Sequence, residues 1–136
     1  MAEFLFRKIV KEAGKEKDIE IASAGILPAT DLEFPLEARQ ALAKEGVDDV
    51  DHRPKGLTSE LLAGTNLLLV MEKHHRDSIL QEFPEAMGKV HLLKTFAGSK
   101  DKDDGVADPY GQSAQIYEKT LSEIKSALMS ILNKVP

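Results

Sequence analysis

The chain has 136 residues, which is long enough for one domain with a single hydrophobic core but not for two. Its net charge of −5 argues against a nucleic-acid or anionic-membrane partner, and no apolar run approaches the length of a membrane span. It contains no cysteine, which excludes disulfides, zinc–thiolate sites and cysteine nucleophiles from this sequence. Because the N-terminus also lacks the layout of a signal peptide, we expect a cytoplasmic protein.

The first third of the chain predicts two helices with a short strand between them. Apolar residues at helical spacing predict an amphipathic helix over residues 1–13, which ends at Gly14 and has no N-cap residue before it. Residues 19–23 predict a short strand. A helix follows over residues 35–44, opened by its proline and closed by Gly46. Its expected inner face consists of four apolar residues: Leu36, Ala38, Leu42 and Ala43.

The rest of the chain alternates helices and strands. Helices are predicted at 58–64, 73–83 and 113–132, strands at 67–71 and 90–94, and a polar loop at 95–107. The continuous apolar run at 67–71 is typical of a parallel strand buried on both faces. The last helix carries one apolar stripe that steps by three and four residues: Tyr117, Leu121, Ile124, Leu128 and Ile131. This alternation predicts a three-layer α/β sandwich with a mostly parallel sheet, folded as a single domain over residues 1–136.

The stretch Asp108-Pro109-Tyr110-Gly111 is the main candidate for chemistry. Pro109 restricts Asp108 to extended geometry and Gly111 permits a sharp reversal, so the carboxylate is held in a stiff frame. A carboxylate held this way is suited to general acid catalysis. The same residues are also an ordinary β-turn signature, with Asp first, Pro second and Gly fourth. Because ligands of parallel sheets bind beyond the carboxyl ends of strands, the place of this loop after residues 90–94 keeps both interpretations open.

The histidines and the remaining acids predict no metal or cofactor site. His52 lies on a polar connector and is interpreted from its pattern as a surface residue. His74 and His75 are neighbours on a helix, so their side chains are expected to point about 100° apart and to make a poor ligand pair. His91 alternates with apolar neighbours and is interpreted as a packed side chain. The acids at 101–104 lack the ligand spacing of a calcium loop and are interpreted as a solvated loop.

Six stretches of the chain match one family in order and spacing. They are Met1-Ala2-Glu3…Phe6-Arg7-Lys8, Ser23-Ala24-Gly25, Ala38-x-x-Ala41-Leu42…Gly46-Val47, His52-Arg53-Pro54…Leu57-Thr58, Leu67-x-x-Val70-Met71-Glu72, and Asp108-Pro109-Tyr110-Gly111…Tyr117. Together they cover essentially the whole chain, which resembles the low-molecular-weight protein tyrosine phosphatases, a family that includes bacterial protein-arginine phosphatases. The form Asp-Pro-aromatic-Gly-x-Ser followed by Tyr117 is more similar to the bacterial members than to the animal ones.

The resemblance implies a mechanism and a role for four residues. In the family a cysteine thiolate attacks phosphorus, and an arginine of the same loop holds the phosphoryl oxygens. Asp108 matches the aspartate that protonates the leaving group and then activates water. Ser23 and His52 match polar residues that support the phosphate loop, and Tyr110 matches an aromatic residue at the cleft wall. The expected substrate is a phosphorylated protein or a small aryl phosphate, with no cofactor.

The chain departs from the family at its start. The family's phosphate loop, Cys-x-x-Gly-Asn-x-Cys-Arg-Ser-Pro, comes immediately before the helix that begins here at Met1, so we expect this chain to be N-terminally truncated and inactive. The family's missing strand lies between the strands expected here at 19–23 and 67–71. Losing about five buried apolar side chains costs roughly 8–15 kcal/mol, as much as a typical domain's stability. We therefore expect a chain that is poorly folded, rearranged, or self-associated through unpaired strand edges.

Three interpretations of this departure remain. The start of the chain is placed at an internal methionine of a longer phosphatase, or the chain is a truncated pseudophosphatase that acts as a binding module. The third, an arsenate reductase on the same scaffold, also needs cysteines. The choice between phosphotyrosine and phosphoarginine depends largely on a residue of the absent loop and stays open.

Overall fold

The computed structural model of the protein describes residues 1–25, 34–48, 50–51, 55–100 and 105–134. Two compact units make up the chain. The first unit combines the segments Met1–Ser23, Asp31–Arg53 and Asp108–Pro136, and the second combines Ala24–Thr30 with Pro54–Ala107. None of the helices in the described part of the chain combines the length and the apolar composition that a membrane crossing requires.

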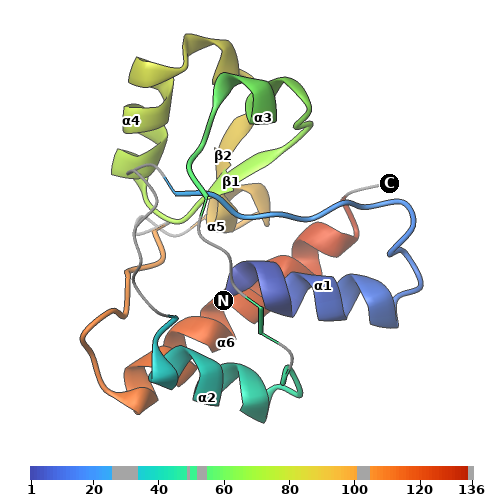
Figure 1. Cartoon of the computed structure of the whole chain (residues 1–136), viewed down its shortest axis with the longest axis vertical. Coiled ribbons are helices and arrows are strands. Elements are labelled where there is room, and N and C mark those ends of the chain that lie inside the picture. The colour runs from blue at the N-terminus through green and yellow to red at the C-terminus, as the bar shows by residue number, and fades with distance from the viewer. Residues whose placement is uncertain (26–33, 49, 52–54, 101–104, 135–136) are drawn as a thin grey trace. The chain divides into compact units, whose positions relative to one another are not determined.

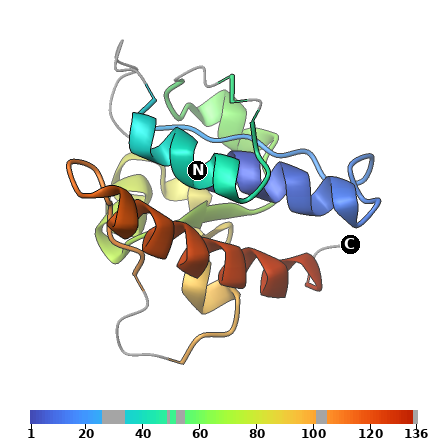
Figure 2. The ribbon, with the colours of Figure 1, turned by 90° about the horizontal axis from the view of Figure 1, so that it is seen from below.

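Three helices form the first unit: α1 (Ala2–Glu12), α2 (Leu36–Lys44) and α6 (Ala114–Leu132) (Figures 1 and 2). The long helix α6 contacts both α1 and α2. The stripe predicted for α6 is confirmed, because all five of its residues are buried: Tyr117, Leu121, Ile124, Leu128 and Ile131. Residues of α1 and α2 complete this core, among them Leu5, Val10 and Leu42. Burial of one face on each helix is what holds the unit together.

The ends of the first two helices agree with the sequence. No side chain caps the start of α1, as its missing N-cap residue predicts. Helix α2 follows Pro35 and is closed by Gly46, whose φ of +82° suits glycine. The Nζ atom of Lys8 donates to the carbonyl of Glu45 at 2.5 Å, and a Cβ on Gly46 would lie 2.8 Å from that Nζ. The positive φ favours glycine at this position, and a larger residue would also displace the flexible end of Lys8.

Two predictions for the first unit are wrong. Residues 19–23 form no strand, because a strand needs a hydrogen-bonded ladder and the described residues offer this segment none. Instead the carbonyl of Ile21 accepts a hydrogen bond from Arg7 at 2.8 Å. On α2, Ala38 and Leu42 are buried as expected, whereas Leu36 and Ala43 are exposed and Ala41 takes their place. The buried residues of α2 are Ala38, Ala41 and Leu42, which share one face of the helix.

The second unit contains the parallel sheet that the sequence predicts. Strand β1 (Leu68–Val70) pairs in parallel with β2 (Val90–Leu92), with Leu68 opposite Val90 and Val70 opposite Leu92. Helices α3 (Ser59–Ala63) and α4 (Lys73–Glu82), the 3₁₀ turn η1 (Pro84–Ala86) and the short helix α5 (Leu93–Phe96) complete the unit (Figure 1). Its core is a cluster of six buried residues: Leu62, Val70, Ile79, Ala86, Val90 and Leu92.

The strands of this unit are shorter and less buried than expected. Of β1 only Val70 is buried, while Leu68 and Leu69 are half-buried. Strand β2 ends at Leu92, and α5 begins at Leu93, so a short helix replaces the last two residues of the predicted strand and the first two of the predicted polar loop. His91 lies with its ring 5.3 Å from that of Phe96, which confirms it as a packed side chain.

Candidate active site

Asp108 lies on an exposed turn of the first unit, before helix α6. Its Oδ1 atom accepts a hydrogen bond from the backbone N–H of Tyr110 at 3.0 Å, which makes an Asx-turn. The β-turn itself falls one residue later than the sequence predicts, since the N–H of Gln112 donates to the carbonyl of Pro109 at 2.9 Å. Gly111 is then the third turn residue, where its φ of +79° is allowed without strain. Asp108 therefore precedes the turn, with one carboxylate oxygen fixed by the turn's backbone.

The environment of Asp108 includes a buried tyrosine at the start of α6. Tyr117 is only 4% exposed. Its pKa is raised above the usual value, first by burial and then by the negative charges of Glu37, Asp108 and Tyr110. Glu37 at the beginning of α2 and two residues of the Asp108 turn thus act electrostatically on one phenol of α6. Of these groups, Glu37 was not predicted as a site residue. Its position could have indicated it, because it is an acid in the first turn of a helix that follows a proline.

Ser23 lies beside the first turn of α1. Its hydroxyl donates to Glu3 Oε1 at 2.5 Å, and the guanidinium of Arg7 lies 2.5 Å from Glu3 Oε2. Because Arg7 also binds the carbonyl of Ile21, these three side chains tie the segment before Ser23 to α1. The carboxylate of Glu3 thus holds the hydroxyl of Ser23 in place. The role of Ser23 in supporting a phosphate loop stays a prediction.

The two remaining candidates differ in how far the structure describes them. Tyr110 is 64% exposed, so its ring is available to a ligand on the Asp108 turn. His52 lies outside the described residues, as do the acids at 101–104, and the predictions for them stay untested.

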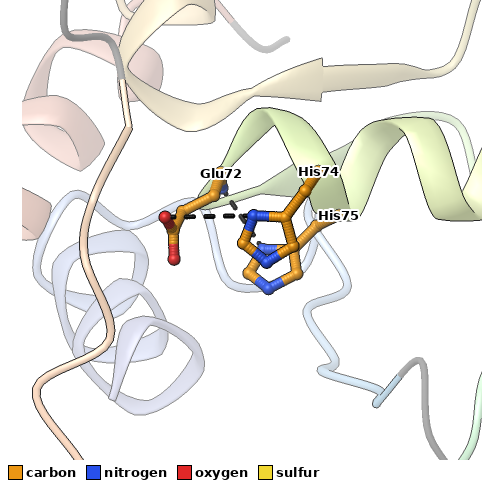
Figure 3. A group of neighbouring side chains, drawn as sticks. All are labelled: Glu72, His74 and His75. Atoms are coloured by element: carbon orange, nitrogen blue, oxygen red, sulfur yellow. Dashed lines mark hydrogen bonds and ion pairs between the residues drawn. The ribbon is translucent and has the colours of Figure 1, made fainter.

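One prediction about histidines is wrong. His74 and His75 are expected to point apart, but their ring centroids lie 4.2 Å from each other, next to Glu72 (Figure 3). Side chains in the first turn of a helix lean back toward its N-terminus, so rings whose Cα positions differ by about 100° still converge there. The sequence feature that could have indicated this cluster is the close spacing of Glu72, His74 and His75 between a strand and a helix.

Comparison with known proteins adds independent findings. The sequence matches the family described as "Low molecular weight phosphotyrosine protein phosphatase" over residues 1–136. It is 30% identical over 117 residues to a protein-arginine-phosphatase of Geobacillus stearothermophilus, with 86% of this chain and 77% of that protein covered. A low molecular weight protein tyrosine phosphatase from T. tengcongensis has a similar structure, with 35% identity, a TM-score of 0.88, and 98% of this chain and 88% of that chain covered.

A further solved structure bears on the chemistry of the family. It is the arginine phosphatase YwlE, in which a serine replaces a cysteine and the active site serine is phosphorylated. Its chain is 29% identical to this one, with a TM-score of 0.88 and coverage of 98% of this chain and 84% of that chain. These likenesses confirm the predicted α/β fold. With a family match along its entire sequence, the chain belongs to the low molecular weight phosphotyrosine protein phosphatases.

Proposed function

We propose that this chain carries the acid/base half of a protein phosphatase site, with Asp108 as the group that moves the proton. The observation that supports this role is the hydrogen bond from the Tyr110 N–H to Asp108 Oδ1. It holds an exposed carboxylate in one orientation, so little ordering entropy is lost when a proton is transferred. Among the described residues no hydrogen bond engages Oδ2, which leaves that oxygen for a substrate or water.

The proposed reaction has two steps that balance around this carboxyl group. In the first, a cysteine thiolate attacks phosphorus, the bond from phosphorus to the leaving atom breaks, and Asp108 gives its proton to that atom. In the second, Asp108 takes a proton from water, which attacks phosphorus and breaks the bond to sulfur. Orthophosphate and the thiolate are the products. Ser23 and His52 support the phosphate loop in this proposal, and Tyr110 contacts the substrate, a phosphorylated protein or a small aryl phosphate.

The first step requires a nucleophile that this sequence does not contain. The phosphorylated serine of the YwlE mutant stands where that enzyme has a cysteine, which supports phosphoryl transfer to that position in a relative. The present 136 residues include no cysteine. We therefore propose that these residues alone hydrolyse no phosphate ester, because serine and threonine hydroxyls are weak nucleophiles at neutral pH.

The test compares two chains. One is the 136-residue chain, and the other carries the first strand and phosphate loop of the Geobacillus relative before Met1. Phosphate release from an aryl phosphate and from phosphoarginine is expected only from the longer chain, and only while its cysteine is intact. Release by the 136-residue chain at rates near those of the relative would overturn the proposal.

A second candidate function is phosphoprotein binding without hydrolysis. The lack of cysteine favours it, because a pseudophosphatase needs recognition surfaces but no nucleophile. Calorimetric titration of the 136-residue chain with phosphotyrosine and phosphoarginine peptides, with unphosphorylated peptides as the control, distinguishes the two candidates. Selective binding of a phosphopeptide supports this second function, and equal binding of both forms of a peptide contradicts it.

A further inference from the structure

Glu72, His74 and His75 form a compact cluster in the second unit, where strand β1 is followed by helix α4 (Figure 3). Each residue offers one ligand atom, and these atoms lie within 4.8 Å of one another. The Oε2 atom of Glu72 is 4.0 Å from Nδ1 of His74. The cluster lies apart in sequence from Asp108, Ser23 and Tyr110, and the proposed phosphatase chemistry uses none of its members.

The backbone at the start of α4 explains why the three side chains converge. Glu72 is the N-cap residue, with extended φ and ψ of −132° and 154°, and its carboxylate accepts a hydrogen bond from the backbone N–H of His75. The N–H of Glu72 in turn donates to Nδ1 of His75 at 3.3 Å. This reciprocal capping box holds the His75 ring over the helix start, next to Glu72. The His74 ring then packs against it at a tilt of 51°.

The donor set of this cluster indicates the class of ligand. Two imidazole nitrogens and one carboxylate oxygen suit Zn²⁺ and Ni²⁺, whereas Ca²⁺ and Mg²⁺ prefer oxygen ligands only. We propose that Glu72, His74 and His75 bind a divalent transition-metal ion, with zinc as the best match. Metal bonds of about 2.0–2.2 Å need the ligand atoms somewhat closer together than they lie here. The side chain of His74 is 69% exposed, so its ring can rotate toward the other two at little cost.

Two features of the site limit its affinity. The N-terminal end of a helix carries partial positive charge, which repels a cation, and the carboxylate of Glu72 offsets this repulsion. Nδ1 of His75 already accepts a hydrogen bond, so a neutral His75 ring carries its proton on Nε2. Metal binding through Nδ1 therefore replaces one hydrogen bond of the capping box. The site is an exposed three-ligand site, with further coordination positions left to water.

The proposal is tested by calorimetric titration of the 136-residue chain with zinc chloride. The variants are His74→Ala, Glu72→Gln and His75→Gln. Each glutamine keeps an oxygen that can serve the capping box, as glutamine does in natural capping boxes, and removes a metal ligand. Each variant is expected to weaken zinc binding at least about tenfold, because three ligands share the ion and each contributes. Asp77→Asn is the matched control, since Asp77 is an exposed acid of α4 outside the cluster, and the affinity should stay within about twofold.

A second measurement locates the ion independently of affinity. Nitrogen–proton correlation spectra of the imidazole rings should show zinc-dependent shifts for His74 and His75 and none for His91. Circular dichroism of each variant confirms that its helix content is unchanged. The proposal is overturned if zinc fails to bind at millimolar concentration, or if His74→Ala and Asp77→Asn bind zinc equally well. Shifts confined to His52 or His91 would also overturn it.

Discussion

The N–H of Tyr110 donates to Oδ1 of Asp108 across 3.0 Å, although Pro109 separates the two residues. This single hydrogen bond decides how the carboxylate is held, because the β-turn that follows begins only at Pro109. The side chain of Asp108 therefore has two roles to distinguish, one in holding the turn and one in the proposed proton transfer. The oxygen bound to the backbone holds the side chain in place, and the proposed function assigns proton transfer to the same carboxyl group.

Asp108→Asn separates these two roles. The asparagine carbonyl accepts the same hydrogen bond from Tyr110, so the turn is retained, but the amide cannot exchange a proton. In the longer chain with a phosphate loop, we expect kcat for an aryl phosphate to fall about 10²–10⁴-fold. In the 136-residue chain, Asp108→Ala is expected to change no catalytic rate. Steady-state kinetics of both chains measure these effects.

The control for this prediction is Asp18→Asn, which neutralises an exposed acid of the same unit. It should leave kcat of the longer chain within about twofold, because solvent and salt screen an exposed charge. If the longer chain is indifferent to Asp108→Asn, the Asp-Pro stretch has only its role as a turn.

Ser113 caps the longest helix of the protein. Its Oγ accepts a hydrogen bond from the N–H of Ile116 at 3.3 Å, which satisfies one of the free donors of the first turn of α6. Ser113→Ala should lower the free energy of unfolding by about 1 kcal/mol. The matched control is Ser122→Ala in the exposed middle of α6, where alanine is the better helix former and stability should rise by at most about 0.5 kcal/mol. Urea unfolding followed by circular dichroism measures both, and equal losses in the two variants would contradict the capping role.

The helices were predictable because their signals are local. Apolar spacing in α6, Thr58 before α3 and Gly46 after α2 each specify a helix or its end within a few residues of sequence. The structure has Thr58 as the cap of α3, since its side chain accepts a hydrogen bond from the N–H of Leu61 at 3.1 Å, and Gly46 closes α2 as predicted. Parallel pairing of β1 and β2 followed from the alternation of helices and strands.

The features that the sequence did not predict depend on partners distant in the chain or on side-chain rotation. Residues 19–23 have strand-like composition, but a strand exists only where a neighbour supplies hydrogen bonds. The exposure of Leu36 depends on which face of α2 helix α6 covers. The convergence of His74 and His75 depends on a capping box that positions one ring. For Asp108, the order Asp-Pro-x-Gly predicted a stiff turn, but the residue at which the turn begins depends on the folded backbone.

Leu121 belongs to the buried core of the first unit. It is 2% exposed on the inner face of α6, and its truncation leaves a cavity that the neighbouring helices cannot fill. Leu121→Ala should lower the free energy of unfolding by about 2–5 kcal/mol. Met129→Ala is the control on the same helix, since Met129 is 49% exposed, and its loss should stay below about 1 kcal/mol. Denaturant unfolding of both variants tests whether α6 is packed as described.

Tyr117 gives the first unit a pH dependence above neutrality. Burial, followed by the charges of Glu37, Asp108 and Tyr110, raises the pKa of its phenol above the value of 10.0 that an unfolded chain has. The folded chain therefore keeps the proton at a pH where the unfolded chain releases it. The contribution of Tyr117 to stability is complete below about pH 10 and is lost as pH rises through the folded-state pKa.

Two measurements check this prediction. In Tyr110→Phe the phenolate absorbance reports Tyr117 alone, because the sequence has two tyrosines, and its midpoint should lie above 10.0. In Tyr117→Phe the free energy of unfolding should fall less steeply with pH above about 10 than in the parent chain, since one titrating group is removed. The lysines titrate in the same range in both chains, so only the difference between the two slopes reports Tyr117. A midpoint at or below 10.0 would contradict the combined effect of burial and the nearby negative charges on this phenol.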